Sequence, residues 1–265
     1  MNQDNHTDIV NRMEMGKTRK GYYIQKKDKL LKNLDKTIYL TRERLAKRYS
    51  PEFIGTLSQD AREEYKKMIP DIPYIEGAMA KPLNSFLLIT AQEVAVYKAM
   101  KKHGKSPAEA WEICHDAITA RMEMFPRWKA WLMNKLMYSG IIRRRIRKRA
   151  ENNERLVFGD FEVGYLIGDG KDFDWGTDYI KCGNYNFVKS QGVEEFAPYV
   201  CLSDMALGKA LGWGLIRTET LADGCYKCDF RFKKGAGIRI SSKTPEVQKT
   251  IERMARPRGF EPLTY

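Results

Sequence analysis

The stretch LVFGDFEVGYLIGDGKDFDWGTDYIKC, from Leu156 to Cys182, decides the fold class. It holds two aromatic and β-branched runs, LVFGDFEVGYLIGDG and FDWGTDYIKC, with a glycine-and-aspartate segment between them. Runs of this composition on either side of a Gly/Asp turn predict a β-hairpin. The chain before Glu151 has helical patterns instead, so the sequence predicts a sheet in the second half only.

The first half of the chain has the apolar spacing of helices. Apolar and charged positions alternate at nearly helical spacing from Gly21 to Tyr49. Ser58 is expected to begin a short helix, and Ser106 with Glu109 has the capping-box spacing of a helix start. A further helix is expected from Phe125 to Ala150.

Two more strands are expected later in the chain. WGLIRTETLA (Trp213–Ala222) and CYKCDFRF (Cys225–Phe232) have strand composition, and Asp223-Gly224 between them predicts a second hairpin. Cys201–Gly212 is expected to be a helix that ends at its glycine. The predicted fold class is therefore α+β. A helical N-terminal half packs against a small, mostly antiparallel sheet of about four strands, with covering helices in the C-terminal half.

The composition changes divide the chain into four parts. Residues 1–55 form an N-terminal helical extension, 56–150 a helical region, 151–240 an α+β region with the candidate site, and 241–265 a tail. The second and third parts are expected to form one compact domain. The tail ends in ARPRGFEPLTY, which fits no amphipathic pattern, so no functional residue is expected there.

Length and composition restrict the class of protein. The 265 residues are 43% apolar and 31% charged, as in globular chains that bury a core. No apolar run approaches the roughly 20 residues that span a bilayer. The N-terminus also lacks the apolar segment of a signal peptide. We therefore expect a cytoplasmic protein with reduced thiols and no membrane partner.

A net charge of +13 is compatible with an anionic or nucleic-acid partner. Much of the excess lies in RRRIRKR, from Arg143 to Arg149, which is expected to be a solvated helix end. No known nucleic-acid-binding module accompanies it, so nucleic acid is not the expected partner. The sequence leaves a homo-oligomer open.

Cys201 and Asp204 form the first candidate pair. Cys201 is expected at the start of a helix, where the helix dipole and free N–H groups can lower a thiol pKa. Asp204, three residues later, falls on the same helical face. The alternative is structural: Asp204 complements the dipole, and Cys201 is a small buried apolar residue.

Cys225 and Cys228 have the CxxC spacing of zinc and redox sites. They lie in an expected strand, where residues three apart point to opposite faces, so no metal site is predicted from this pair. A four-thiolate site of Cys182, Cys201, Cys225 and Cys228 stays open as an alternative. No cofactor is predicted, and a divalent or thiolate-bound metal is left open.

The segment RTET offers hydrogen-bonding groups. In the expected strand, Arg217 and Glu219 share one face, while Thr218 and Thr220 share the other. Such hydroxyls can donate to a carboxylate or carbonyl group. The alternative is the ordinary preference of threonine for strands.

Together these residues resemble the L-2-amino-thiazoline-4-carboxylic acid hydrolase family. The resemblance covers Ile72 to Lys234 and excludes both ends of the chain. Cys114 and Cys225 fall outside the pattern and are not expected to be catalytic. The segments IPYIEGAMAKPLNSF (residues 72–86) and SPAEAWEI (residues 106–113) resemble the family's N-terminal portion. Four further motifs match: Cys182 after a strand; Pro198, Tyr199, Cys201 and Asp204; Arg217, Thr218, Thr220 and Gly224; and Cys228 to Phe232.

The resemblance implies hydrolytic opening of a small cyclic amidine that bears a carboxylate, giving a carbamoyl-cysteine. That reaction needs a nucleophile, a proton donor for the leaving group and an anchor for the carboxylate. We expect Cys201 to attack as a thiolate and Asp204 to move the proton, while direct attack by water with Asp204 as base fits equally. The remaining candidates are Asp229 as a second base, Arg217, Thr218 and Thr220 as substrate anchors, and Cys182 and Cys228 in the pocket wall.

Two other functions stay open: a small-molecule sensor without turnover and a thiolate metal-binding protein. The arrangement in space separates them. A ligand pocket requires the five central candidates to border one cavity of about 300 Å³ or more. Those five are Cys182, Cys201, Asp204, Thr220 and Cys228.

Overall fold

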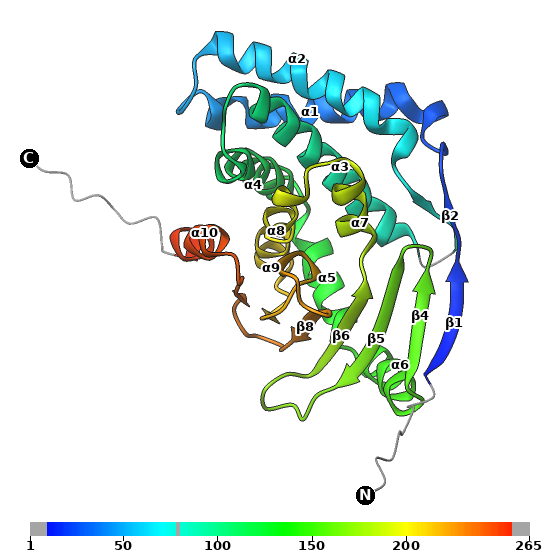
Figure 1. Cartoon of the computed structure of the whole chain (residues 1–265). Coiled ribbons are helices and arrows are strands. Elements are labelled where there is room, and N and C mark those ends of the chain that lie inside the picture. Colours follow the sequence, from blue (N-terminus) through cyan, green and yellow to red (C-terminus); the bar gives the residue numbers. More distant parts are fainter. Residues whose placement is uncertain (1–9, 78–79, 256–265) are drawn as a thin grey trace, which may run out of the picture.

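The computed structural model describes residues 10–77 and 80–255. A group of helices packs against one edge and face of a mixed sheet (Figure 1). The fold class is α+β, as predicted from the sequence. The helices are α1 (Lys27–Leu45), α2 (Pro51–Met68), α3 (Lys81–Lys102), α4 (Pro107–Glu123), α5 (Arg127–Met137), α6 (Gly140–Glu151), α7 (Gly183–Ser190), α8 (Ala197–Val200), α9 (Ser203–Leu211) and α10 (Pro245–Ala255).

The main sheet has seven strands in the order β1-β4-β5-β6-β8-β7-β9. Its central pairs are antiparallel, and parallel pairs close both edges, β1 with β4 and β7 with β9. The strands are β1 (Asn11–Gly16), β4 (Glu154–Phe158), β5 (Phe161–Ile167), β6 (Trp175–Lys181), β7 (Leu215–Arg217), β8 (Cys228–Phe232) and β9 (Arg239–Ile240), while β2 (Thr18–Arg19) and β3 (Tyr74–Ile75) form a separate ladder.

The predicted hairpin around the Gly/Asp segment is present as β5 and β6. The run before it makes two strands rather than one, because Gly159 turns the chain with φ +56° between β4 and β5. This turn and the short edge strands explain why the sheet has more than the expected four strands.

Strand β1 lies in the segment that was expected to be helical. It pairs in parallel with β4, whose residues come about 140 positions later in the chain. Most of β1 is exposed, so no local apolar pattern marks it as a strand. Its last residue, Gly16, has to be glycine because a Cβ there would lie 1.9 Å from the carbonyl oxygen of Glu76.

The helix starts follow capping chemistry. Glu109 accepts a hydrogen bond from the Ser106 backbone N–H at 2.9 Å, and the Ser106 hydroxyl accepts one from the Glu109 N–H, as the capping box predicts. Helix α2 begins at Pro51 after the cap Ser50, so the expected start at Ser58 is wrong. The Ser58 hydroxyl instead donates to the Ile54 carbonyl inside the helix.

The helix expected from 125 to 150 is two helices, α5 and α6. Ser139 separates them, and its hydroxyl accepts from the Ile142 N–H at the start of α6. A serine side chain competes for backbone N–H groups and so favours a new helix start over continuation. The basic run Arg143–Arg149 lies in the second of these helices.

The connection between β7 and β8 is a long loop, so the expected tight turn at Asp223-Gly224 is wrong. Strand β7 ends at Arg217, and a 3₁₀ turn at Leu221–Asp223 interrupts the loop. Thr218 and Thr220 follow β7 rather than sharing a face of it, and Cys225 lies outside β8.

The layers meet at α7, α8 and α9. Helix α3 contacts α7, and α4 contacts both α8 and α9 (Figure 1). Leu87, Val94 and Ala95 of α3 are fully buried in one large core cluster with Trp111 of α4. The core therefore positions the first residues of α9 against the sheet.

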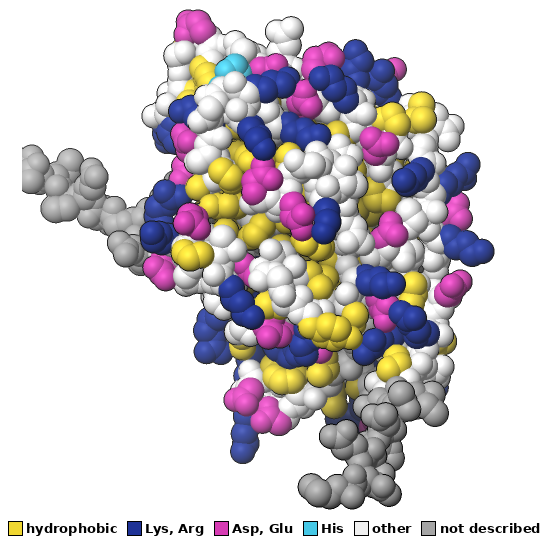
Figure 2. Space-filling model, in the orientation of Figure 1, with side chains coloured by type: hydrophobic (Ala, Val, Ile, Leu, Met, Phe, Trp, Pro, Cys, Tyr) yellow, Lys and Arg dark blue, Asp and Glu magenta, His cyan; other side chains and the backbone are white. Residues whose placement is uncertain are grey.

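On the face drawn in Figure 2, basic and acidic side chains are interspersed with exposed apolar ones. Figure 2 thus shows no single basic stripe over this face, although the net charge is +13. Among the helices of the described residues, none has both the length and the apolar character to cross a bilayer.

Candidate functional site

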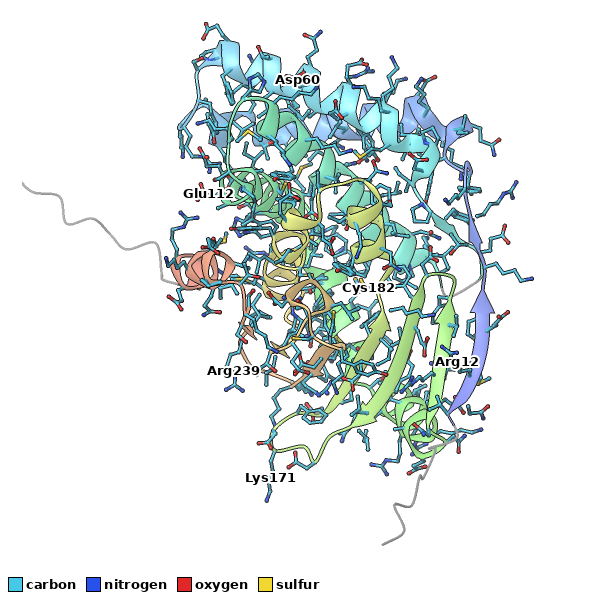
Figure 3. The ribbon with its side chains drawn as sticks, viewed as in Figure 1. Arg12, Asp60, Glu112, Lys171, Cys182 and Arg239 are labelled. Atoms are coloured by element: carbon cyan, nitrogen blue, oxygen red, sulfur yellow. The ribbon has the colours of Figure 1, made fainter. Side chains whose placement is uncertain are left out.

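Five of the predicted site residues come together where the sheet meets the helices: Cys182, Cys201, Asp204, Arg217 and Cys228. Arg217 forms an ion pair with Asp204, and its Nη1 donates to the Cys201 carbonyl oxygen at 2.9 Å. The thiols of Cys182 and Cys228 are near enough to Cys201 to influence each other's ionisation. Figure 3 shows Cys182 where β6 gives way to α7, beside the helical layer.

Arg217 is the buried cation of this cluster. It ends β7, only 2% of the residue is exposed, and its guanidinium lies 5.6 Å from the ring centre of Phe230. Its Nε has no hydrogen-bond partner within the described residues. A buried arginine with one carboxylate partner needs that partner, because an unpaired charge is expensive to bury.

Asp204 is the carboxylate of the pair and lies in the first turn of α9. Its side chain keeps 23% of its surface exposed. Burial raises the pKa of Asp204, and the positive charge of Arg217 opposes that rise. The carboxylate is therefore held in place by Arg217 while part of it stays accessible.

The thiol of Cys201 is not at a free helix N-terminus, which corrects the sequence-based expectation. Cys201 follows α8, and its backbone N–H donates to the Ala197 carbonyl oxygen at 3.2 Å. Burial raises the pKa of Cys201 despite the opposing charge of Arg217. The expected lowering of this thiol pKa is therefore wrong, because burial outweighs any helix dipole.

Burial has the same effect on the pKa of the two neighbouring thiols, Cys182 and Cys228. Burial raises the pKa of Cys182 to about 12 and that of Cys228 to about 12. The Leu221 N–H donates to the Cys228 sulfur at 3.2 Å, which fixes that side chain against the loop. These thiols are thus neutral near pH 7.

Asp229 is committed to the loop after β7. Its carboxylate accepts from the N–H groups of Thr218 and Glu219 at 2.8 and 2.6 Å, and from the Thr218 hydroxyl at 2.7 Å. These bonds end the β7 ladder and turn the chain. The geometry accordingly supports a structural position for Asp229 and Thr218.

Thr220 organises the same loop. It is 1% exposed, its hydroxyl donates to Asp223 at 2.9 Å, and it accepts from the Asp223 N–H at 3.0 Å. The Asp223 carboxylate also accepts from Ser242 and Thr244 beyond β9. The threonine hydroxyl is therefore engaged within the protein.

Glu93 belongs to the cluster, and sequence reasoning missed it. It lies on α3, is 4% exposed, and accepts a 2.5 Å hydrogen bond from the Ser203 hydroxyl, next to Asp204. Burial, with a contribution from Asp204, raises the pKa of Glu93 to about 8. The available signal was one acidic residue inside LLITAQEVAVY, a helix that the sequence marks as largely buried.

All five cysteines are free thiols. Within residues 10–77 and 80–255, no three or more His, Cys, Asp or Glu side chains are grouped so that they could hold a metal ion. Cys225 lies on the loop, apart from the strand position of Cys228.

A cavity lies in the helical layer, next to this cluster. Its volume is about 410 Å³, and α1, α2, α3 and α4 supply most of its wall. Glu93 and Leu207 connect it to the cluster, because Glu93 contacts Ser203 and Leu207 belongs to α9. None of the five residues expected to border one hollow lines this cavity.

The comparisons with known proteins give one match. The family model described as L-2-amino-thiazoline-4-carboxylic acid hydrolase matches residues 85–232, which is more than half of the 265 residues. The matched segment includes Glu93 and every residue of the cluster. No curated protein and no solved structure matches the chain. The chain belongs to the L-2-amino-thiazoline-4-carboxylic acid hydrolase family.

Proposed function

We propose that this protein is a hydrolase that opens a small cyclic amidine, such as 2-amino-thiazoline-4-carboxylate, to a carbamoyl-cysteine. The observation that carries the proposal is the ion pair of Arg217 and Asp204 beside Cys201, inside the segment that the family model matches. A small heterocycle that bears a carboxylate needs both a base and a cation, and this pair supplies both.

The cluster offers a place for such a substrate. Cys182, Cys201 and Asp204 keep some accessible surface, although burial is the largest influence on the pKa of each group. We place the substrate against the accessible surface of these three residues, with its carboxylate toward the guanidinium of Arg217.

Direct attack by water is the mechanism that the electrostatics favour. The thiols of Cys182, Cys201 and Cys228 are neutral near pH 7, so a ready thiolate is scarce, whereas the charge of Arg217 favours the carboxylate form of Asp204 and opposes the pKa rise caused by burial. Asp204 takes one proton from water as its oxygen adds to the ring carbon between nitrogen and sulfur. The C=N electron pair moves to the ring nitrogen, and the tetrahedral intermediate then loses its carbon–sulfur or carbon–nitrogen ring bond as the added hydroxyl becomes a carbonyl. The departing atom receives the proton from Asp204, and the hydroxyl proton passes to the ring nitrogen.

In the covalent alternative, Asp204 takes the proton of the Cys201 thiol as the sulfur adds to the same carbon. The ring bond then breaks, and Asp204 gives this proton to the departing sulfur or nitrogen. Water adds to the same carbon and the bond to the enzyme sulfur breaks, so that one proton of water returns to the Cys201 sulfur and the other passes to a nitrogen of the product. Glu93 is a positioning residue in either route, since it fixes Ser203 beside Asp204. The hydrogen bonds of Thr218, Thr220 and Asp229 support the loop that follows Arg217.

The test is hydrolysis of 2-amino-thiazoline-4-carboxylate by the purified chain, followed by chromatography of the carbamoyl-cysteine. Asp204→Asn should lower kcat by at least about 100-fold, because general-base catalysis contributes about that much. Cys201→Ala should keep most of the activity if water attacks directly. Cys225→Ala, outside the cluster, is the matched control.

The two routes and the proposal itself give different results. Loss of activity in Cys201→Ala, with a substrate adduct on Cys201 detected by mass spectrometry, would establish the covalent route. Full activity in Asp204→Asn would remove Asp204 from both routes. A wild-type protein that opens neither this ring nor related carboxylated cyclic amidines would overturn the proposed function.

A further inference from the structure

The cavity of the helical layer has the size and lining of a ligand site. Its volume of about 410 Å³ falls in the range of about 300–1,000 Å³ that small-molecule pockets occupy. Apolar side chains from four helices make most of its wall. They include Leu34, Ile38, Leu57, Ile89 and Ile118.

Arg121 is the charged group of this wall. Its Nη1 donates to the Thr37 hydroxyl and the Gln92 side-chain oxygen, both at 3.4 Å. No aspartate or glutamate among the described residues forms an ion pair with it, in contrast to Arg217. Burial lowers the pKa of Arg121, which shows that the surroundings disfavour its charge. An anion at Arg121 would remove this penalty.

A second cation lies at the same end. A smaller hollow of about 160 Å³ shares Thr37, Arg121 and Met124 with the cavity and is also lined by Asn33 and Lys36. Lys36 and Asn33 are exposed, so this hollow connects the arginine with the surface. The accessible end of the cavity is therefore basic.

The other end is uncharged. Cys114 contacts Glu93 there, and it precedes Arg121 by two turns of α4, or about 10 Å along the helix. With its pKa raised to about 8, Glu93 is mostly protonated at pH 7. Leu207 and Ile113 complete an apolar inner wall. One end thus suits an anion and the rest suits a hydrocarbon chain.

We propose that this cavity binds an amphipathic alkyl carboxylate, with its carboxylate at Arg121 and Lys36 and its hydrocarbon chain among the apolar side chains of α1, α3 and α4. This site is separate from the cluster of Cys201 and Asp204, and it does not depend on the proposed hydrolysis.

Titration calorimetry of the full chain with decanoate tests the site. Wild type should bind one decanoate, and Arg121→Gln should weaken binding by about tenfold or more, since charge-assisted hydrogen bonds are among the strong ones. Decanol and decylamine should bind more weakly than decanoate to wild type. Arg42→Gln, on an exposed arginine of α1 outside the cavity, should leave binding unchanged.

A filled cavity is the second arm of the experiment. Ala117→Phe places a ring in the cavity and should abolish binding while the far-ultraviolet circular dichroism stays that of wild type. The proposal fails if wild type does not bind decanoate, or if decanoate binds folded Arg121→Gln or Ala117→Phe as tightly as wild type. It also fails if decylamine binds as well as decanoate. Hydrolase activity enters none of these readouts, so the two proposals fail independently.

Discussion

The junction of sheet and helices and the cavity of the helical layer handle buried polar groups in opposite ways. At the junction, Arg217 pairs with Asp204, and Ser203 donates to Glu93. In the helical layer, Arg121 borders about 410 Å³ of space and has only neutral partners at 3.4 Å. The candidate reactive groups therefore lie at the junction, whereas the cavity volume lies in the helical layer.

Glu93 joins the two regions. Its carboxylate accepts from Ser203 at the junction, and the same residue lines the cavity. Its second oxygen, Oε2, has no hydrogen-bond partner within the described residues. A change in the charge of Glu93 therefore acts on both regions.

The largest expected effect on stability comes from breaking the Arg217–Asp204 ion pair at the junction. Arg217→Met removes the cation and leaves Asp204 in a buried site, and loss of one partner of a buried ion pair costs about 3–5 kcal/mol. Urea denaturation measures the change in the free energy of unfolding. Arg239→Met, on an exposed arginine of β9 (labelled in Figure 3), should change it by less than about 0.5 kcal/mol. Equal small losses in both variants would show that the pair does not hold the junction.

The second effect is the pH dependence that Glu93 contributes. Its pKa is about 8 in the folded protein and 4.5 in the unfolded chain, so between these values the folded state binds the extra proton. The contribution to stability is complete below pH 4.5 and falls as pH rises through 8, by at most about 1.4 kcal/mol per pH unit.

Glu93→Gln keeps the shape of the side chain and removes the titration. Urea denaturation between pH 5 and 9 should therefore give a flatter profile for Glu93→Gln than for wild type, whereas Glu43→Gln, at an exposed position of α1, should follow wild type. Parallel profiles for Glu93→Gln and wild type would mean that Glu93 is ionised in the folded protein near neutral pH.

The third effect compares free volume with tight packing. Ala117 borders the cavity, whereas Ala95 on α3 is fully buried and does not. Ala95→Leu should lower stability by about 1–3 kcal/mol through overpacking. Ala117→Leu should leave stability unchanged or raise it by up to about 1 kcal/mol. Thermal unfolding of the two variants measures this difference, and equal destabilisation would show that the cavity is not free to accept side-chain atoms.

The smallest expected effect is a loss of helix stability that leaves the candidate site and the cavity unchanged. Ser106→Ala removes the capping box of α4 and should cost about 1 kcal/mol in urea denaturation. Ring opening and decanoate binding should match wild type when measured on the folded variant, because Ser106 contacts neither the cluster nor the cavity. A change in either activity without a loss of stability would contradict this separation.

Local patterns predicted the elements that depend on local chemistry. The capping box at Ser106 and the left-handed Gly212 that ends α9 are present as expected. Strand β1 could not be predicted in this way, since its stability comes from β4, distant in the sequence. The loop after Arg217 differs from the predicted strand for a related reason. The Asp229 carboxylate accepts hydrogen bonds from the N–H groups that would otherwise continue the strand ladder.

For the candidate site, too, the sequence predicted some features and not others. Family motifs identified Cys201, Asp204 and Arg217, and the fold brings these residues together. The motifs could not give their ionisation, which depends on burial by segments far along the chain. Glu93 lies on α3, more than 100 residues before Ser203, and no spacing rule connects them.

By itself, the sequence determined the α+β class, the start of α4, the end of α9 and the residue types available for chemistry, because periodicity and capping act over a few neighbouring residues. Only the tertiary structure decided that Arg217 has a carboxylate partner whereas Arg121 has none among the described residues. It also decided that the thiols of Cys182, Cys201 and Cys228 are neutral near pH 7 and that Glu93 links the cluster to the cavity. The physical reason is that desolvation and charge pairing depend on which distant segments surround a group.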